Sequence, residues 1–286
     1  HNAASPDTCT DWYRRCDAAL ARGHEVYVQT SCQPLSFDFT LEDPYLLYSH
    51  DAFDRVKAAR PEDRAAIYAD PAFRARFRHN LAHPGQGLLF YGDWSKVEFA
   101  DGTTVAGAAA VANRDPLDFF FDAALRNGEW TQFIAKLFQN DDAGVAPLLR
   151  HPAGVLAFSD AGAHLIYFCD AGFGLHFLAK WVRGTGTFTL AEAAYRLAAE
   201  PAARYRIPER GRITPGHWAD LLLFDPATVG VSGLVRVPDL PGGGTRIIRR
   251  PTGVHGVWVN GTRVFDGQEY VPLPAGPGHV LDRFEA

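Results

Sequence analysis

The chain has 286 residues, of which 47% are hydrophobic and 21% charged, and its formal net charge at pH 7 is −5. This composition is that of an ordinary globular protein. The acidic balance and the lack of a dense Lys/Arg block argue against a nucleic-acid partner, and no apolar run reaches the roughly 18–20 residues of a membrane span. We therefore expect one large domain, or a large domain with a small companion, that binds neither nucleic acid nor a membrane.

The chain contains four cysteines and no methionine, and its first residue is His1. No two cysteines form a C-x-x-C pair, and a chain of this length does not depend on disulfides, so we predict reduced thiols in a cytoplasmic protein. Because translation starts at methionine, the sequence also suggests a piece of a longer protein.

The first elements alternate between helix and strand. Residues 8–22 repeat apolar side chains (Trp12, Cys16, Leu20) at three- and four-residue spacing and predict a helix that Gly23 ends. EVYVQT at 25–30 is rich in β-forming residues and predicts a strand. This order is typical of an α/β protein with a parallel sheet.

A long excursion follows this strand. No clear periodicity is visible up to residue 48, and residues 51–82 predict short charged helices broken by Pro61 and Pro71. We interpret residues 36–110 as an insertion, which in an α/β enzyme often covers a site.

The alternation then resumes and finally changes. Helices are predicted over 116–126, 141–150 and 189–199, the last opened by a capping box of Thr189 and Glu192. Beyond about residue 207, short strands alternate with turns rich in Gly, Pro and Asn, and Asn260-Gly261 is typical of a β-hairpin. We therefore predict a mixed helix–strand part over 1–206 and an all-β part over 207–286.

The stretch VLAFSDAGAH joins a buried strand, predicted over Val155–Phe158, to the carboxylate of Asp160. In parallel α/β barrels the active site lies where the strands end. An aspartate there can act as a general base or as a metal ligand. A helix cap or an Asx turn would explain the same residue without any function.

Several other residues are weaker candidates. His164 and His176 follow Asp160 and can contact a substrate or fill a structural role, while Cys169 fits a small buried thiol better than a nucleophile. Lys136 and Asn140 flank a predicted loop and are plausible substrate contacts, but they fit surface and cap positions better. No G-x-S-x-G, P-loop or G-x-G-x-x-G sequence occurs, which argues against hydrolase-fold esterases and nucleotide enzymes.

Four motifs occur in order along the chain: LLRHPAGVLAFSDAGAH, GFGLHFLAKWVR, TLAEAAYRLAAEPAARYRIPERGRITPGHWADLLLFDP and VHGVWVNGTRVFDG. Together they resemble the C-terminal half of the amidohydrolase superfamily, specifically its N-acyl-D-amino-acid deacylase (D-aminoacylase-like) branch. The resemblance covers nearly all of the chain, most securely residues 140–268. It implies an α/β fold: the C-terminal part of a metal-dependent (β/α)8 TIM barrel, about strands 6–8, followed by strands of a small β-sandwich.

The resemblance also implies roles for individual residues. Asp160 corresponds to the aspartate that ends the eighth barrel strand, where it lies beside the metal and takes a proton from the attacking water. His1 falls near the histidine ligand that ends the sixth strand, residues 25–30 form the seventh strand, and His164 is implied as a substrate contact. The implied cofactor of the intact protein is Zn²⁺, as one ion or two.

The sequence departs from this branch in two places. The H-x-H of the first barrel strand and the ligands of the middle strands do not occur. A catalytic zinc usually has three protein ligands, and only His1 and Asp160 are candidates, so we expect the chain alone to bind metal weakly and to be inactive. HNAAS and CQPLS stand where the branch has a lysine and Tyr-Pro-Tyr, so specificity for D-amino acids is not implied.

The implied function is hydrolysis of a non-peptide C–N bond, in a small-molecule amide such as an N-acyl amino acid. Two alternatives stay open: a cyclic-amide hydrolase, like hydantoinases and dihydroorotases, and a non-catalytic barrel protein without metal. A metal-free glycosidase would need a second carboxylate beside Asp160, and the strand at 25–30 ends without one. Exposed strand edges make an oligomer possible.

Overall fold

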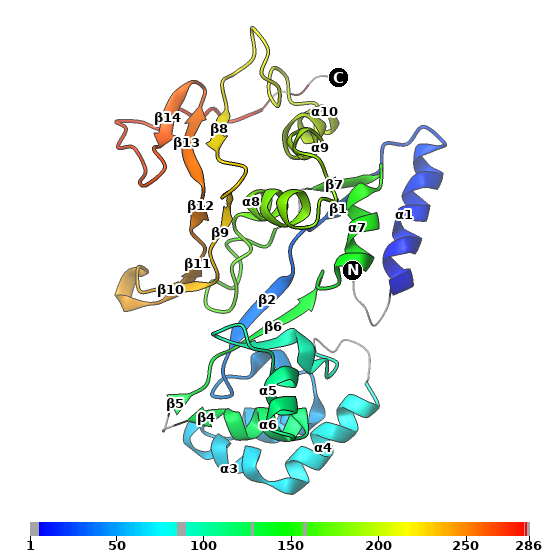
Figure 1. The fold of residues 1–286 in the computed structure, drawn as a ribbon, viewed down its shortest axis with the longest axis vertical. Coiled ribbons are helices and arrows are strands. Elements are labelled where there is room, and N and C mark those ends of the chain that lie inside the picture. Colours follow the sequence, from blue (N-terminus) through cyan, green and yellow to red (C-terminus); the bar gives the residue numbers. More distant parts are fainter. Residues whose placement is uncertain (1–5, 85–89, 127–128, 157–158, 283, 285–286) are drawn as a thin grey trace.

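The structure is a computed structural model that describes residues 6–84, 90–126, 129–156, 159–282 and 284. It is a mixed α/β protein, and its described residues form several small sheets without a closed barrel. In Figure 1 a helical unit lies below and is joined through β2 (Leu35–Phe39) and β6 (Phe133–Phe138) to an upper part that holds the remaining sheets.

The helices are mostly short, and several begin at the Asp, Thr or Pro positions from which the sequence predicts a start. They are α1 (Pro6–Leu20), α2 (Asp54–Ala58), α3 (Arg64–Ala69), α4 (Pro71–Ala82), α5 (Val105–Val111), α6 (Pro116–Ala123), α7 (Asp142–Arg150), α8 (Phe173–His176), α9 (Leu190–Ala194) and α10 (Glu200–Arg204). Two π-helical stretches, Phe177–Gly184 and Tyr195–Ala199, continue α8 and α9. Within the described residues, no helix is both long and apolar enough to cross a bilayer.

The remaining strands are also short. They are β1 (Val28–Thr30), β3 (Val97–Phe99), β4 (Leu125–Arg126), β5 (Glu129–Trp130), β7 (Gly154–Leu156), β8 (Leu221–Phe224), β9 (Gly230–Val231), β10 (Val235–Val237), β11 (Arg246–Ile248), β12 (Pro251–Thr252), β13 (Val254–Val259) and β14 (Thr262–Phe265).

The strands β1 and β7 form a parallel pair in which Val28 lies opposite Gly154 and Thr30 opposite Leu156. All of β7 is buried, so its sequence is a continuous apolar run without the alternation of a half-exposed strand. Both predicted strands are therefore confirmed, although β1 begins only at Val28, and residues 157–158 lie outside the described part of the chain.

Helices α1 and α7 lie beside this pair (Figure 1). The hydroxyl of Tyr13 donates to the carbonyl of Leu148 at 3.0 Å and forms a hydrogen bond with the Thr30 hydroxyl at 2.5 Å, which ties α1 to both α7 and β1. Trp12, which belongs to the apolar repeat of this helix, is 61% exposed, whereas Tyr13 is 4% exposed. Tyr13 is turned inward because its hydroxyl finds partners there.

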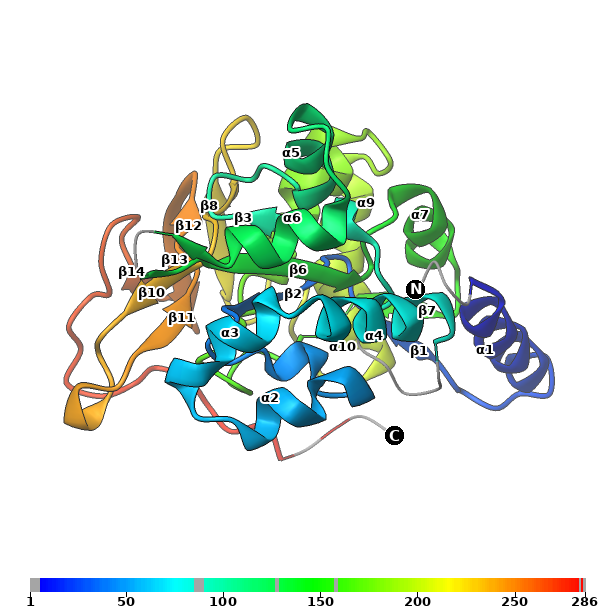
Figure 2. The same ribbon diagram turned by 90° about the horizontal axis from the view of Figure 1, so that it is seen from below.

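The helical unit surrounds the antiparallel sheet β2–β6–β3 (Figure 2). Its core consists largely of aromatic side chains, among them the fully buried Phe53, Phe77, Phe120 and Phe133. The helices predicted over 51–82 are confirmed, and Pro61 and Pro71 each open a helix. The strands β2 and β6, by contrast, are not predicted from the sequence, which shows no clear periodicity at β2 and suggests a loop near β6.

The C-terminal region consists of short strands, as predicted. The sheet order is β14–β13–β8, and Asn260 and Gly261 turn its hairpin with φ of 48° and 81°, the left-handed values that favour Asn-Gly. β8 is an edge strand whose leucines Leu221–Leu223 are exposed. A β-sandwich of two packed sheets is not seen among the described residues.

A buried ion pair fastens the helix of residues 190–204 to the segment before β7. Arg196 and Glu200 are both buried and 2.8 Å apart, and Arg196 also donates to the carbonyl of Leu149 at 2.6 Å. Arg204 joins Glu200 at 2.8 Å and donates to the carbonyl of Pro152 at 2.6 Å. The two arginines thus satisfy carbonyl groups that flank the entry to β7.

We predict that Glu200→Gln lowers the free energy of unfolding by about 3 kcal/mol, because it leaves the buried Arg196 charge without a counterion. Urea denaturation monitored by circular dichroism measures this change. The matched control is Asp54→Asn, which breaks the exposed pair with Lys57 and should change the value by less than about 0.5 kcal/mol. Equal effects of the two substitutions would contradict the assigned role of the buried pair.

Candidate functional site

Asp160 lies in the turn that follows β7, half-buried, and its carbonyl accepts the N–H of Ala163 at 3.0 Å. The Ser159 hydroxyl accepts the N–H of Ala161 at 3.1 Å, which fixes the start of the turn. Because β1 and β7 are parallel and in register, their carboxyl ends share one edge. The structure therefore puts Asp160 at the same edge as the residues that follow Thr30.

A second aspartate holds this edge together. Asp170 is 3% exposed, and its backbone carbonyl accepts hydrogen bonds from the Ser159 hydroxyl at 3.0 Å and from the Gln33 amide at 2.6 Å. Burial raises the pKa of the Asp170 carboxyl to about 6, Arg249 opposes this shift, and the negative charge of Asp160 adds to it. Sequence reasoning missed Asp170, whose only signal was its place next to Cys169.

The C-terminal region closes over this loop through Arg249. Its guanidinium donates to the carbonyl of Cys169 at 2.8 Å and to the carbonyl of Ser232 at 3.1 Å. Burial lowers the pKa of Arg249, while Cys169 and Asp170 raise it. The β-rich region thus contributes a positive charge that contacts the loop at Cys169 and lies close enough to Asp170 to affect its pKa.

His164 lies in the same loop and is exposed, with a left-handed φ of 47°. Such a conformation is uncommon for a residue other than glycine and is found often at functional sites. The ring of His164 lies 6.2 Å from that of Tyr167 and 5.9 Å from that of Phe168, measured between centroids.

The His164 loop is held from both sides. From the helical unit, the N–H of Asp38 donates to the Tyr167 carbonyl at 2.6 Å, and the ring of Tyr45 stacks on that of Tyr167 with centroids 3.8 Å apart. From the C-terminal region, Arg236 donates to the Ile166 carbonyl and to the Asp38 carboxylate, both at 3.1 Å. Burial raises the pKa of Asp38, and Arg236 and a hydrogen bond from Gln132 oppose this.

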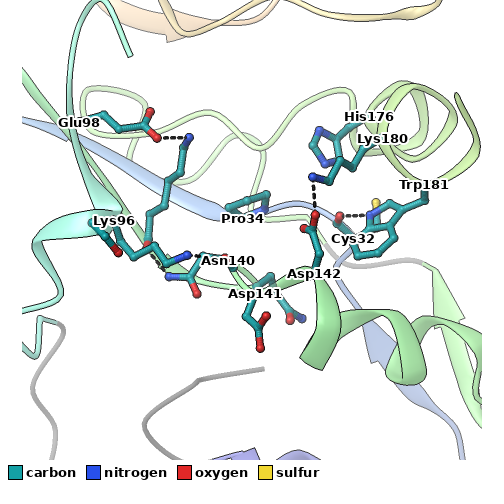
Figure 3. A pocket seen from close by; sticks show the side chains of 13 residues that line it. Cys32, Pro34, Lys96, Glu98, Asn140, Asp141, Asp142, His176, Lys180 and Trp181 are labelled. Atoms are coloured by element: carbon teal, nitrogen blue, oxygen red, sulfur yellow. Dashed lines mark hydrogen bonds and ion pairs between the residues drawn. The ribbon is translucent and has the colours of Figure 1, made fainter. Parts of the chain in front are cut away.

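A cavity of about 490 Å³ lies beside these loops, between the helical unit and the helix that begins with α8 (Figure 3). The lining side chains come from the exit of β1, from the β3 and β6 region, from the start of α7 and from α8 with its π-helical continuation. They are Cys32, Pro34, Ser95, Lys96, Glu98, Lys136, Gln139, Asn140, Asp141, Asp142, His176, Lys180 and Trp181. The sequence candidates Lys136, Asn140 and His176 meet here, whereas Asp160 and His164 do not line this cavity.

The three lysines of the cavity have different partners. Lys136 pairs with Glu98, and Lys180 pairs with Asp142, each at 2.5 Å. Lys96 donates to the backbone carbonyl of Asn140 at 2.9 Å and makes no ion pair within the described residues.

His176 has an unusual environment on the cavity wall. The pKa of its imidazole is lowered to about 4, mainly by burial and also by the positive charges of Arg249, Lys180 and Lys136, while Asp142 opposes the shift. The ring is therefore neutral at pH 7, and within the described part of the chain it makes no hydrogen bond.

The chain is similar to several known proteins over part of their length. No protein-family model matches the chain. The D-aminoacylase of Alcaligenes xylosoxydans xylosoxydans is 34% identical over 109 residues, which are 38% of this chain and 20% of that protein. The N-acyl-D-aspartate deacylase of the same organism is 36% identical over 104 residues, or 36% of this chain and 19% of that protein. An uncharacterised protein of Mycobacterium tuberculosis is 30% identical over 228 residues, or 72% of this chain and 36% of that protein.

The structure also resembles a solved D-aminoacylase structure, which is described as defining a novel subset of amidohydrolases. The superposition covers 99% of this chain and 48% of the D-aminoacylase chain, with a TM-score of 0.51 and 18% sequence identity. Over about a third of its length the chain is thus similar in sequence to D-aminoacylase and to N-acyl-D-aspartate deacylase, and the likeness to the solved structure extends the similarity in fold to nearly the whole chain. The chain spans well under half the length of each of these curated relatives.

The metal site implied by the amidohydrolase resemblance does not fit the described residues. No group of three or more His, Cys, Asp or Glu residues within this part of the chain is placed to hold a metal ion. Asp160 lies near Asp170, and among the described residues no histidine joins these two carboxylates to form a group of three. The other predicted ligand, His1, lies outside the described residues.

We predict that acidification destabilises the protein through His176. Its imidazole has a pKa of about 4 when folded and an ordinary value of 6.5, so the unfolded chain takes up the proton first as the pH falls. Stability should therefore decrease between about pH 6.5 and pH 4, by at most about 3 kcal/mol from this group. Thermal unfolding of the wild type and His176→Gln over this pH range measures it, and identical pH dependence in both would refute the assignment.

Proposed function

We propose that this chain contributes the strand-exit loops of an amidohydrolase that cleaves a non-peptide C–N bond, in the amide of an N-acyl amino acid. Two relatives support the substrate class, since they are named D-aminoacylase and N-acyl-D-aspartate deacylase. The activity belongs to the longer polypeptide that we propose to contain this chain, and residues 1–286 alone are proposed to be inactive. The division into 1–206, with an insertion at 36–110, and 207–286 is part of this proposal.

The observation that carries the proposal is the position of Asp160. It follows the buried strand β7 at the edge where β1 also ends, which is where parallel α/β enzymes build their sites. The hydrogen bonds from Ser159 and Gln33 to Asp170 hold this loop in place. A fixed, half-buried carboxylate of this kind is suited to accept a proton from a water molecule and to return it to the leaving nitrogen.

His164 is proposed as the substrate contact. Its strained backbone is held by Asp38, Arg236 and the Tyr45–Tyr167 stack, so its exposed ring is presented in one orientation. The aromatic rings of Tyr167 and Phe168 beside it supply apolar area for the acyl group or the amino-acid side chain of such a substrate.

Zinc remains part of the proposal only for the longer protein. We propose His1 and Asp160 as ligands, and the further ligands must come from residues beyond those described here. Because the described residues do not assemble three ligands, no step is assigned to the metal.

Two other functions are compatible with the same fold. A cyclic-amide hydrolase would use the same aspartate, and a non-catalytic protein would keep the fold without the reaction. The exposed leucines on the edge strand β8 support self-association, because an unpaired edge strand offers hydrogen-bonding groups to another chain.

We predict that the product of the complete open reading frame containing this sequence releases acetate from N-acetyl amino acids, and that Asp160→Asn lowers kcat at least about 100-fold without changing the melting temperature. Acetate release and hydantoin ring opening, assayed in parallel, separate linear from cyclic amides. The control Asp54→Asn, on the exposed surface of α2, should keep full activity. Full activity in Asp160→Asn would rule out its role as the base.

For residues 1–286 alone, we predict less than one equivalent of tightly bound zinc, because three protein ligands are the usual requirement. Isothermal titration with ZnCl2, compared between the wild type and Asp160→Asn, measures this. Stoichiometric binding that disappears in Asp160→Asn would show that the chain carries a complete site, contrary to the prediction.

A further inference from the structure

We propose that the cavity of Figure 3 is a binding site for a small organic carboxylate, separate from the Asp160 loop, with Lys96 as the group that receives the charge. This goes beyond the proposed hydrolysis and does not depend on it. A ligand here touches neither Asp160 nor His164, since neither lines the cavity.

The dimensions of the cavity suit a small molecule. Its volume of about 490 Å³ lies within the roughly 300–1,000 Å³ of typical ligand sites. One wall is rigid, because the buried Trp181 donates its indole N–H to the carbonyl of Cys32 at 2.6 Å. Pro34 and Trp181 give this wall an apolar surface, and Gln139 and Asn140 supply amide groups at the other side.

Lys96 is the one lysine of the cavity lining that makes no ion pair within the described residues, although Asp141 adds a third carboxylate to the lining. Lys136 and Lys180 each have a carboxylate partner at 2.5 Å. The ammonium of Lys96 meets only the carbonyl oxygen of Asn140 within the described residues. A half-buried ammonium group with a neutral partner gains most from an added anion, because a charge-assisted hydrogen bond is about twice as strong as a neutral one.

The opposite wall favours the same ligand charge. Besides burial, the positive charges of Arg249, Lys180 and Lys136 lower the pKa of His176, whereas Asp142 raises it. The neutral imidazole offers one donor and one acceptor, and it makes no hydrogen bond within the described residues. An anion whose carboxylate lies at Lys96 can therefore use this imidazole as a second polar contact for its amide or hydroxyl group.

The start of α7 does not offer its free N–H groups to the anion. The carboxylate of Asp141 accepts the N–H groups of Ala143 and Gly144, both at 3.2 Å, and so caps that helix. The anion is consequently assigned to Lys96.

The test is a titration of residues 1–286 with N-acetylglycine, and with uncharged N-acetylglycinamide as the matched ligand. We expect saturable binding of N-acetylglycine, at least 10-fold weaker binding of the amide, and a similar loss in Lys96→Gln. Lys96→Arg should retain binding because it keeps the charge, and Lys57→Gln, on the exposed surface of α2, should behave like the wild type. Melting temperatures of all variants exclude unfolding as the cause.

A second readout reports on the cavity itself. Bound carboxylate should raise the pKa of the His176 imidazole, followed by NMR and identified by its loss in His176→Gln, because an anion stabilises the protonated ring. Asp160→Asn should bind normally, which separates this site from the proposed active site. The proposal is overturned by an absence of saturable binding, by unchanged binding in Lys96→Gln, by loss of binding in Asp160→Asn, or by equal competition from chloride.

Discussion

The parallel pairing of β1 with β7 is the constraint on which the rest of the structure depends. Parallel strands cannot be joined by a tight turn, and here the connection contains the whole helical unit and α7. Because the pairing is parallel, both strands end at the same edge of the sheet. The backbone N–H and C=O groups of the residues that follow them are no longer paired by the sheet. Where such groups are buried they need protein partners, since a buried unpaired carbonyl costs about 1–3 kcal/mol.

Long side chains from distant parts of the sequence supply these partners. Gln33 reaches the carbonyl of Asp170, Arg249 reaches that of Cys169, and Arg236 reaches that of Ile166. Each of them satisfies a backbone group in the loop after β7. The result is a loop held in several places, which explains how His164 can keep a left-handed backbone and how Asp160 stays half-buried at the edge.

Local features were predictable from the sequence because local interactions create them. The capping box of Thr189 and Glu192 and the Asn260-Gly261 hairpin form as expected. The strands β2 and β6 were missed because they are stabilised by pairing across a separation of about a hundred residues. In β6 apolar residues lie on both faces, and the alternation in β2 is only five residues long. Asp160 was found by its position after an apolar run, but the cavity residues Lys96 and His176 could not be brought together, since only the folded insertion places them on facing walls.

The cavity and the Asp160 loop share one backbone segment without sharing a side chain. Cys32 forms part of the cavity wall, and its carbonyl is fixed by Trp181. The next residue, Gln33, holds the carbonyl of Asp170, which also receives the Ser159 hydroxyl beside Asp160. Because Cys32 and Gln33 are buried and adjacent, a shift of the wall moves the anchor of the loop as well. Cys32 and Gln33, at the exit of β1, therefore constrain the cavity wall and the loop after β7 together. The position of Asp160 depends on these contacts as well as on the end of β7.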